Sequence, residues 1–150
     1  WLDARFAKTG FKPEGGLGAA IVDLADNVPY DVQRLAHETW DDVRASGRKT
    51  ATLEDLHTTL TRMLRQHGLV YEEQWQRLTL AQRAVLRALV LEHGRELLSA
   101  AVRQRHRLSG ASSVQSSLAA LVREDIVMRD GSRYLLTDSL YREWIARRTF

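Results

Sequence analysis

The chain has 150 residues, no cysteine, 44% hydrophobic and 27% charged residues, and a formal net charge of +3. This length suits one compact domain or two small ones, and the lack of cysteine excludes a disulfide scaffold, a thiolate metal site and a thiol nucleophile. No apolar run approaches the roughly 20 residues that a bilayer span needs, so we expect a cytoplasmic protein without a membrane partner. The chain begins at Trp1 without a signal-peptide pattern, and we expect it to be the C-terminal part of a longer protein.

Charge is distributed unevenly along the sequence. Residues 1–75 carry 9 Lys and Arg against 12 Asp and Glu, whereas residues 76–150 carry 13 Arg against 7 Asp and Glu. An acidic first half and a basic second half predict two units with different partners. Arg outnumbers Lys 19 to 3, which suits phosphate binding but also follows from genomic base composition.

The first half is predicted to be a small helical bundle over residues 1–68. Pro29 fits the first turn of a helix, where its missing N–H has no partner to lose. Thr52 and Asp55 form a capping-box pattern, and His67-Gly68 is expected to end that helix. A short polar connector helix is predicted over residues 69–78. Apolar residues at intervals of three and four define the helices of the bundle, at residues 1–7, 17–25, 29–45 and 53–67.

The second half, residues 79–150, is predicted to be a winged helix-turn-helix. Thr79 begins a helix that ends at His93-Gly94, and a second helix runs from about Ser99 to about residue 107. After a turn at residues 108–110, a third helix is capped by Ser112 or Ser113. The apolar period then changes from 3.6 to 2 around Asp130-Gly131, which predicts a hairpin, and a last helix follows. The predicted fold class is mainly α, with one β-hairpin as the wing.

Four segments carry a resemblance to a known family: ADNVPYDVQRLA (25–36), LAQRAVLRAL (80–89), SVQSSLAAL (113–121) and YLLTD (134–138). They are similar to the C-terminal helical lid and winged helix of AAA+/STAND-type ATPases, the group that includes archaeal-type ATPases and origin-recognition-like proteins. Asn27 stands where that family usually has glycine. Asparagine also tolerates a left-handed backbone, so the turn is expected to form.

The resemblance implies a role for the first half as a lid over nucleotide. By resemblance, Pro29 and Arg34 lie near the nucleotide, and ATP and Mg²⁺ are cofactors of the full-length protein. The lid would pass its nucleotide state to the winged helix by movement about residues 68–78.

No catalytic or metal site is predicted within the chain itself. There is no G-x-x-x-x-G-K-[ST] sequence, so we expect no ATP hydrolysis by this chain alone and no cofactor held by it. The sequence around His37-Glu38 lacks the second histidine of an H-E-x-x-H zinc site, and the histidines are scattered. Any ATP-hydrolysing core is therefore expected before Trp1.

A basic and polar surface around the helix-turn-helix predicts contact with double-stranded DNA. Arginines bind phosphate, whereas small hydroxyl and amide side chains allow a helix to approach a groove closely. The predicted contact residues are Arg103, Arg105, Arg107, Ser112, Gln115, Ser116, Arg129 and Arg133.

Two alternatives stay open, because a fold does not fix a function. The winged helix could be a protein-interaction or autoregulatory module, with the chain's own N-terminal ATPase core or another protein as partner. Alternatively, the chain is a free-standing helix-turn-helix regulator in which residues 1–68 form a dimerisation or sensor unit.

Overall fold

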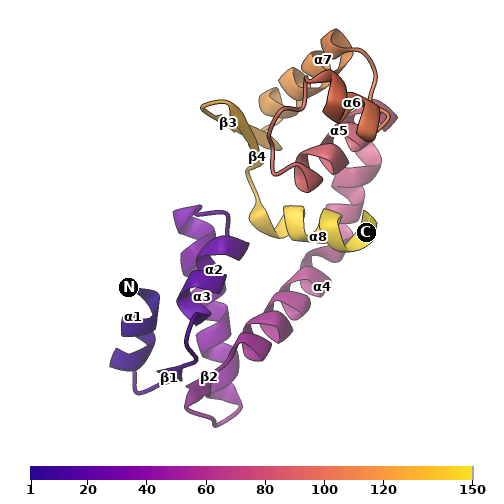
Figure 1. Cartoon of the computed structure of the whole chain (residues 1–150). Coiled ribbons are helices and arrows are strands. Elements are labelled where there is room, and N and C mark those ends of the chain that lie inside the picture. Colours follow the sequence, from indigo (N-terminus) through magenta and orange to yellow (C-terminus); the bar gives the residue numbers. More distant parts are fainter. Residues whose placement is uncertain (150) are drawn as a thin grey trace. The chain divides into compact units, whose positions relative to one another are not determined.

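The structure, a computed structural model, describes residues 1–149 (Figure 1). It is mainly helical, with eight helices and two two-stranded sheets within the described residues. Contacts divide the chain into two compact units, Trp1–His67 and Gly68–Phe150. None of the helices in residues 1–149 is both long and apolar enough to cross a membrane.

The first unit is the predicted helical bundle. It contains α1 (Leu2–Lys8), α2 (Leu17–Leu24), α3 (Pro29–Ala45) and the first part of α4 (Leu53–Arg77). Pro29 lies in the first turn of α3, as predicted. Asn27 has a φ of 59°, so asparagine does adopt the left-handed backbone expected there. The core is built from the apolar faces of these helices: Leu17, Ile21, Leu35, Val43, Leu56 and Leu60.

Two short parallel strands in this unit have no counterpart in the sequence prediction. Strand β1 (Lys12–Pro13) pairs with β2 (Thr50–Ala51), and the Lys12 N–H donates to the Lys49 carbonyl at 2.6 Å. Glu14 follows β1 and accepts from the Leu53 N–H at the start of α4 at 2.7 Å. Strands of two residues show no alternation of apolar and polar side chains, so periodicity could not reveal them.

The prediction that a helix ends at His67-Gly68 is wrong. Helix α4 continues without a break to Arg77, and the predicted connector at residues 69–78 consists mostly of its last turns. The capping box at its other end is confirmed, since the Thr52 N–H donates to Asp55 and the Asp55 N–H donates to the Thr52 hydroxyl. A glycine within a helix costs about 1 kcal/mol. Tyr71 and Trp75, four residues apart and both buried in the second unit, outweigh that cost.

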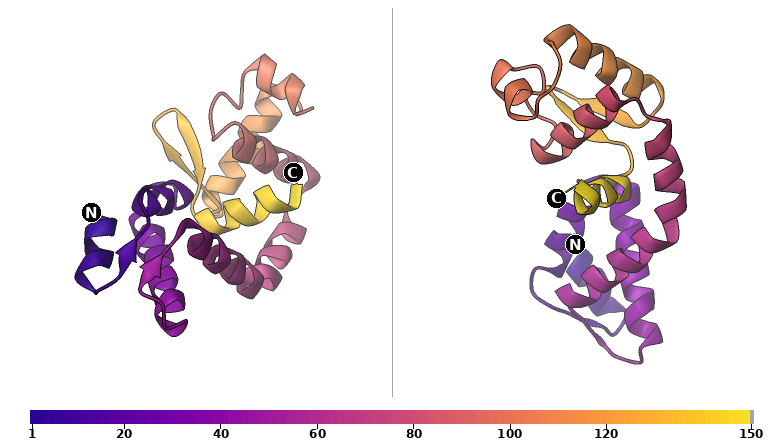
Figure 2. Two further views of the ribbon diagram at one scale, coloured as in Figure 1. Left: turned by 60° about the horizontal axis from the view of Figure 1, so that its bottom comes forward. Right: turned by 90° about the vertical axis from the view of Figure 1, so that its right-hand side faces the viewer.

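The second unit has the element order of a winged helix. Helices α5 (Leu80–Leu91), α6 (Ala100–Arg105) and α7 (Ala111–Arg123) precede the strands β3 (Val127–Asp130) and β4 (Arg133–Leu136), and α8 (Ser139–Thr149) ends the unit. Helix α7 packs on α5 and on β3, and α8 packs on α5. Figure 2 shows the two strands side by side, with their turn extending from the helices of the unit.

At the ends of the helices in this unit, the predicted cap of α5 is confirmed, whereas the predicted caps of α7 and the predicted end of α6 are wrong. Thr79 caps α5 in a complete capping box with Gln82, as its predicted start requires. Neither Ser112 nor Ser113 caps α7, because the N-cap is Gly110 and the helix already begins at Ala111. Helix α6 ends at Arg105 rather than near residue 107.

The hairpin turn is shifted by one residue from the predicted Asp130-Gly131 pair. Asp130 pairs with Arg133, so Gly131 and Ser132 form the turn. Gly131 has a φ of 61° and takes the first central position, where a type II′ turn favours glycine.

A close backbone contact joins the wing to the connection between α5 and α6. The Tyr134 N–H in β4 donates to the Gly94 carbonyl at 2.9 Å. Gly94 has a φ of 73°, and a Cβ at this position would lie 1.7 Å from the carbonyl oxygen of Tyr134. Only glycine meets both the conformation and the space at this position.

Aromatic side chains form the part of the core where α4 meets α8. The rings of Tyr71 and Tyr141 stack at 5.0 Å, and Trp144 packs against Tyr141 at 5.8 Å and against Trp75 at 6.2 Å. The Tyr71 hydroxyl donates to Asp138 at 2.8 Å. The Tyr141 hydroxyl is buried without a hydrogen-bond partner among residues 1–149, and burial raises its pKa far above the usual range.

We expect Gly94→Ala to destabilise the second unit by about 3 kcal/mol or more, because a left-handed backbone and a clash with Tyr134 add up. Gly131→Ala is the matched control. Its φ is also positive but its Cβ would meet nothing within 4 Å, so about 1 kcal/mol is expected. Urea unfolding followed by tryptophan fluorescence measures both, and equal losses would contradict the close contact.

Removing the Tyr141 hydroxyl is expected to stabilise the protein by about 1 kcal/mol, because an unpaired buried hydroxyl carries a desolvation cost without a bond. Tyr71→Phe is expected to have the opposite sign and a similar size, since it removes the bond to Asp138. The same unfolding measurement compares the two variants. A clear loss of stability in Tyr141→Phe would show that the hydroxyl does have a partner.

Candidate nucleic-acid interface

Helix α7 has a mostly apolar buried side and a mostly polar exposed side, with Ser117 buried and Val122 exposed as the exceptions. Val114, Leu118 and Leu121 are buried, whereas Ser112, Gln115 and Ser116 are exposed. The helix contains no acidic residue from Ala111 to Arg123. Three of the predicted contact residues therefore share one outward side of α7, and no carboxylate of this helix repels a phosphate there.

The turn before α7 presents an exposed arginine. Arg107 has a φ of 53° and forms no side-chain hydrogen bond or ion pair within residues 1–149. Arg103, one turn earlier in α6, donates Nε–H to the Leu98 carbonyl at 3.1 Å. A carbonyl is neutral, so this bond orients the Arg103 guanidinium without cancelling its charge.

The two wing arginines are held by backbone oxygens. Arg129 donates Nε–H to the Gly131 carbonyl at 3.0 Å and lies over the Tyr134 ring at 5.6 Å. Arg133 donates Nε–H to the His93 carbonyl at 2.8 Å. These contacts hold one arginine on each side of the wing turn. Arginines placed in this way are suited to phosphate contacts.

Arg105 differs from Arg103 and Arg129 because a carboxylate pairs with it. Its Nη1 lies 2.7 Å from Oε1 of Glu92, and Nε2 of His106 lies 2.6 Å from the same oxygen. The pKa of the Glu92 carboxyl is lowered by the hydrogen bond from His106 and then by Arg105, so it is ionised at neutral pH. No local sequence pattern predicts a role for Glu92. Its contacts lie 13 and 14 residues away, beyond any helical spacing.

Acidic side chains limit the positive field around this surface. Glu124 and Asp125 are exposed directly after α7, and Asp130 is exposed at the end of β3. The positive field of this surface therefore comes from the arginines named above rather than from a broad basic face.

The structure places the two residues predicted near nucleotide on α3 of the first unit. Pro29 is exposed at the start of the helix. Arg34 is half-buried, and its Nη2 lies 2.8 Å from Nε2 of His67. Because a guanidinium only donates, Nε2 of His67 accepts this bond.

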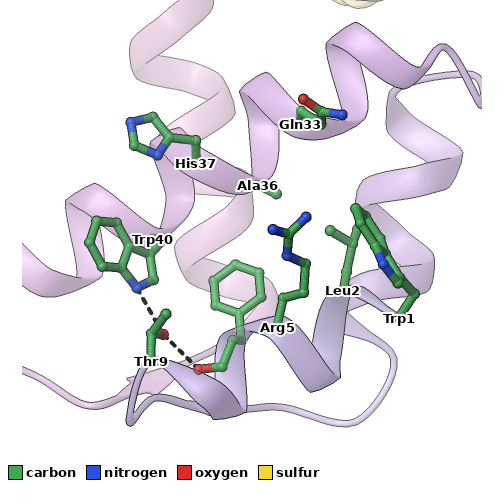
Figure 3. Close-up of a pocket in the computed structure, with 9 residues that line it drawn as sticks. Trp1, Leu2, Arg5, Thr9, Gln33, Ala36, His37 and Trp40 are labelled. Carbon is green, nitrogen blue, oxygen red and sulfur yellow. Dashed lines mark hydrogen bonds between the residues drawn. The ribbon is translucent and has the colours of Figure 1, made fainter.

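A pocket of about 530 Å³ lies between α1 and α3 in the first unit (Figure 3). The Trp40 indole donates to the Thr9 hydroxyl at 3.0 Å, and the Arg5 guanidinium lies over the Trp1 ring. Neither Pro29 nor Arg34 lines it. The described residues also contain no group of three His, Asp or Glu side chains placed to hold a metal ion.

Comparison with known proteins assigns a family to the second unit. The family described as "Probable winged helix domain" matches residues 69–147, more than half of the chain. No curated protein and no solved structure matches the chain. The family match begins within the last turns of α4, which agrees with the burial of Tyr71 and Trp75 in this unit. It assigns no AAA+/STAND family.

Proposed function

The chain belongs to the "Probable winged helix domain" family, and from this premise we propose that its second unit binds double-stranded DNA, largely through phosphate contacts. Helix α7 would lie in a groove, and the hairpin would contact the neighbouring backbone. The observation that carries this proposal is the exposed side of α7 around Ser112, Gln115 and Ser116, where the helix has no carboxylate over residues 111–123.

The arginines around α7 support phosphate contacts rather than base readout as the main source of affinity. Arg107 is exposed at the turn, and Arg103, Arg129 and Arg133 are oriented by carbonyl groups. Phosphate contacts give sequence-independent binding that weakens steeply with salt. Ser112, Gln115 and Ser116 are short enough to permit close approach of the helix to base edges.

A protein partner is the second candidate, because apolar side chains are exposed on this unit. Leu69 in α4 is 83% exposed and Leu80 at the start of α5 is 81% exposed, although both are large hydrophobic residues. Such residues favour a contact with another protein or with the ATPase core of the same protein. A free-standing regulator would use the same DNA-binding surface without an ATPase core.

We further propose that the chain is the lid and winged-helix region of a P-loop ATPase whose core lies outside it. Support comes from the helical first unit and from the left-handed Asn27 two residues before the helix-starting Pro29. In this proposal Pro29 and Arg34 approach the nucleotide, and ATP and Mg²⁺ belong to the full-length protein. The gene sequence preceding the codon for Trp1 tests it: an encoded P-loop supports it, and an immediate start codon overturns it.

DNA binding is tested by titrating a fluorescent duplex with the protein at several salt concentrations. We expect a Kd of about 10⁻⁶ M at low salt that weakens steeply as salt rises. Arg107→Gln and Arg129→Gln are each expected to weaken binding about 3- to 10-fold and to reduce the salt slope by about 1.

Arg65→Gln is the control for this titration. Arg65 is an exposed arginine of α4 in the first unit, so its loss changes the net charge equally without touching the winged helix. An equal effect of all three substitutions would mean that net charge alone drives binding. Absence of binding at low salt would favour the protein-partner candidate.

We expect the 150-residue chain alone to hydrolyse ATP no faster than buffer, because no phosphate-cradling loop is present in its sequence. A phosphate-release assay with purified chain and Mg²⁺-ATP measures this. Turnover that persists through a second purification step would contradict the proposed location of the catalytic core.

A further inference from the structure

We propose that Glu92 weakens DNA binding by neutralising Arg105. While the pair is intact, this arginine does not bind a DNA phosphate. This inference rests on the proposed DNA-binding function. In it, Glu92 does not contact DNA and acts only through Arg105. It also changes the part assigned to Arg105, which the sequence alone places among the DNA contacts.

Glu92 and Arg105 meet at the ends of two neighbouring helices. Glu92 is the C-terminal cap residue of α5, and Arg105 is the last residue of α6, six residues before α7 begins. The 2.7 Å contact between Arg105 and Glu92 is a charge-assisted hydrogen bond. The His106 ring binds the same carboxylate oxygen, which fixes the carboxylate beside the helix-turn-helix.

Glu92 cancels the charge of Arg105. A Lys or Arg side chain releases counterions from DNA when it neutralises a phosphate. An arginine whose charge is already balanced by a carboxylate contributes less to this release. Arg105 and Glu92 sum to zero, whereas the contacts of Arg103 and Arg129 with backbone carbonyls leave their charges intact. A phosphate approaching Arg105 therefore meets a neutral pair.

Arg105 is accessible to solvent, whereas Glu92 is mostly covered. The Arg105 side chain is 61% exposed, whereas that of Glu92 is 20% exposed. Arg105 thus remains within reach of a ligand in solvent, and Glu92 rather than burial limits its attraction for phosphate. Removing the Glu92 charge should make this cation available without opening the core.

The test compares duplex binding by the complete chain and by charge variants at several salt concentrations. We expect Glu92→Gln to tighten binding about 3- to 10-fold and to steepen the salt slope by about 1, the signature of one added phosphate contact. Arg105→Gln alone leaves the Glu92 carboxylate unpaired and is expected to weaken binding, but without reducing the salt slope, because paired Arg105 contacts no phosphate. In the double variant, Arg105→Gln should remove the gain that Glu92→Gln produces.

Glu72→Gln is the matched control. Glu72 in α4 pairs with Arg148 of α8, and hydrogen bonding from Gln76 and then from Arg148 lowers its pKa, so this substitution also removes one charge and one arginine pair. The pair lies outside the helix-turn-helix, and we expect no change in salt slope. Equal gains for Glu72→Gln and Glu92→Gln would overturn the inference, because net charge would then explain both.

The remaining outcomes separate this inference from the proposed function. Binding by the wild type that falls with Arg107→Gln, together with no gain for Glu92→Gln, overturns the role of Glu92 and leaves the function standing. A salt slope that falls by about 1 in Arg105→Gln, as in Arg107→Gln, also overturns it, since Arg105 would already bind phosphate in the wild type. Absence of binding by both the wild type and Glu92→Gln overturns the function and the inference together.

Discussion

The backbone contact between Gly94 and Tyr134 fixes the wing of this protein relative to its helix-turn-helix. A glycine carbonyl accepts the Tyr134 N–H, and no side chain fits between the two backbones. The residues next to this contact also bind each other, because Arg133 of the wing donates to the carbonyl of His93. Glu92, one residue earlier, is placed where it meets the end of α6. One close backbone approach therefore places the wing arginines and the carboxylate that pairs with Arg105.

Which arginines around α7 keep an uncompensated charge depends on this arrangement more than on the amino-acid composition. The second half of the sequence has a net charge of +6, yet its arginines are not equivalent in the folded unit. Neutral carbonyls orient Arg103 and Arg129, whereas the carboxylate of Glu92 binds Arg105. Electrostatic attraction to a polyanion depends on the cations that remain uncompensated, so the count of arginines overstates the field of the surface.

Local sequence patterns predicted most of the helices and the hairpin because each pattern reports on nearby residues. Three of these patterns depend only on residues within three positions of one another: Pro29 in a first helical turn, the Thr52–Asp55 capping box and the Thr79 cap. The continuation of α4 past Gly68 depended instead on Tyr71 and Trp75 packing with α8, about 70 residues along the chain. Glycine in a helix is a weak stop signal, and long-range burial of two aromatic rings outweighs it.

The same distinction applies to the candidate interface. Spacing within α7 was enough to predict that Ser112, Gln115 and Ser116 share an exposed side, since the helical period fixes which residues face the core. The state of each arginine could not be predicted in this way, because its partner comes from another element: Leu98 for Arg103, His93 for Arg133 and Glu92 for Arg105. A helix-turn-helix pattern thus predicts which side chains are exposed, whereas the tertiary contacts decide how much of the arginine charge on that surface is left uncompensated.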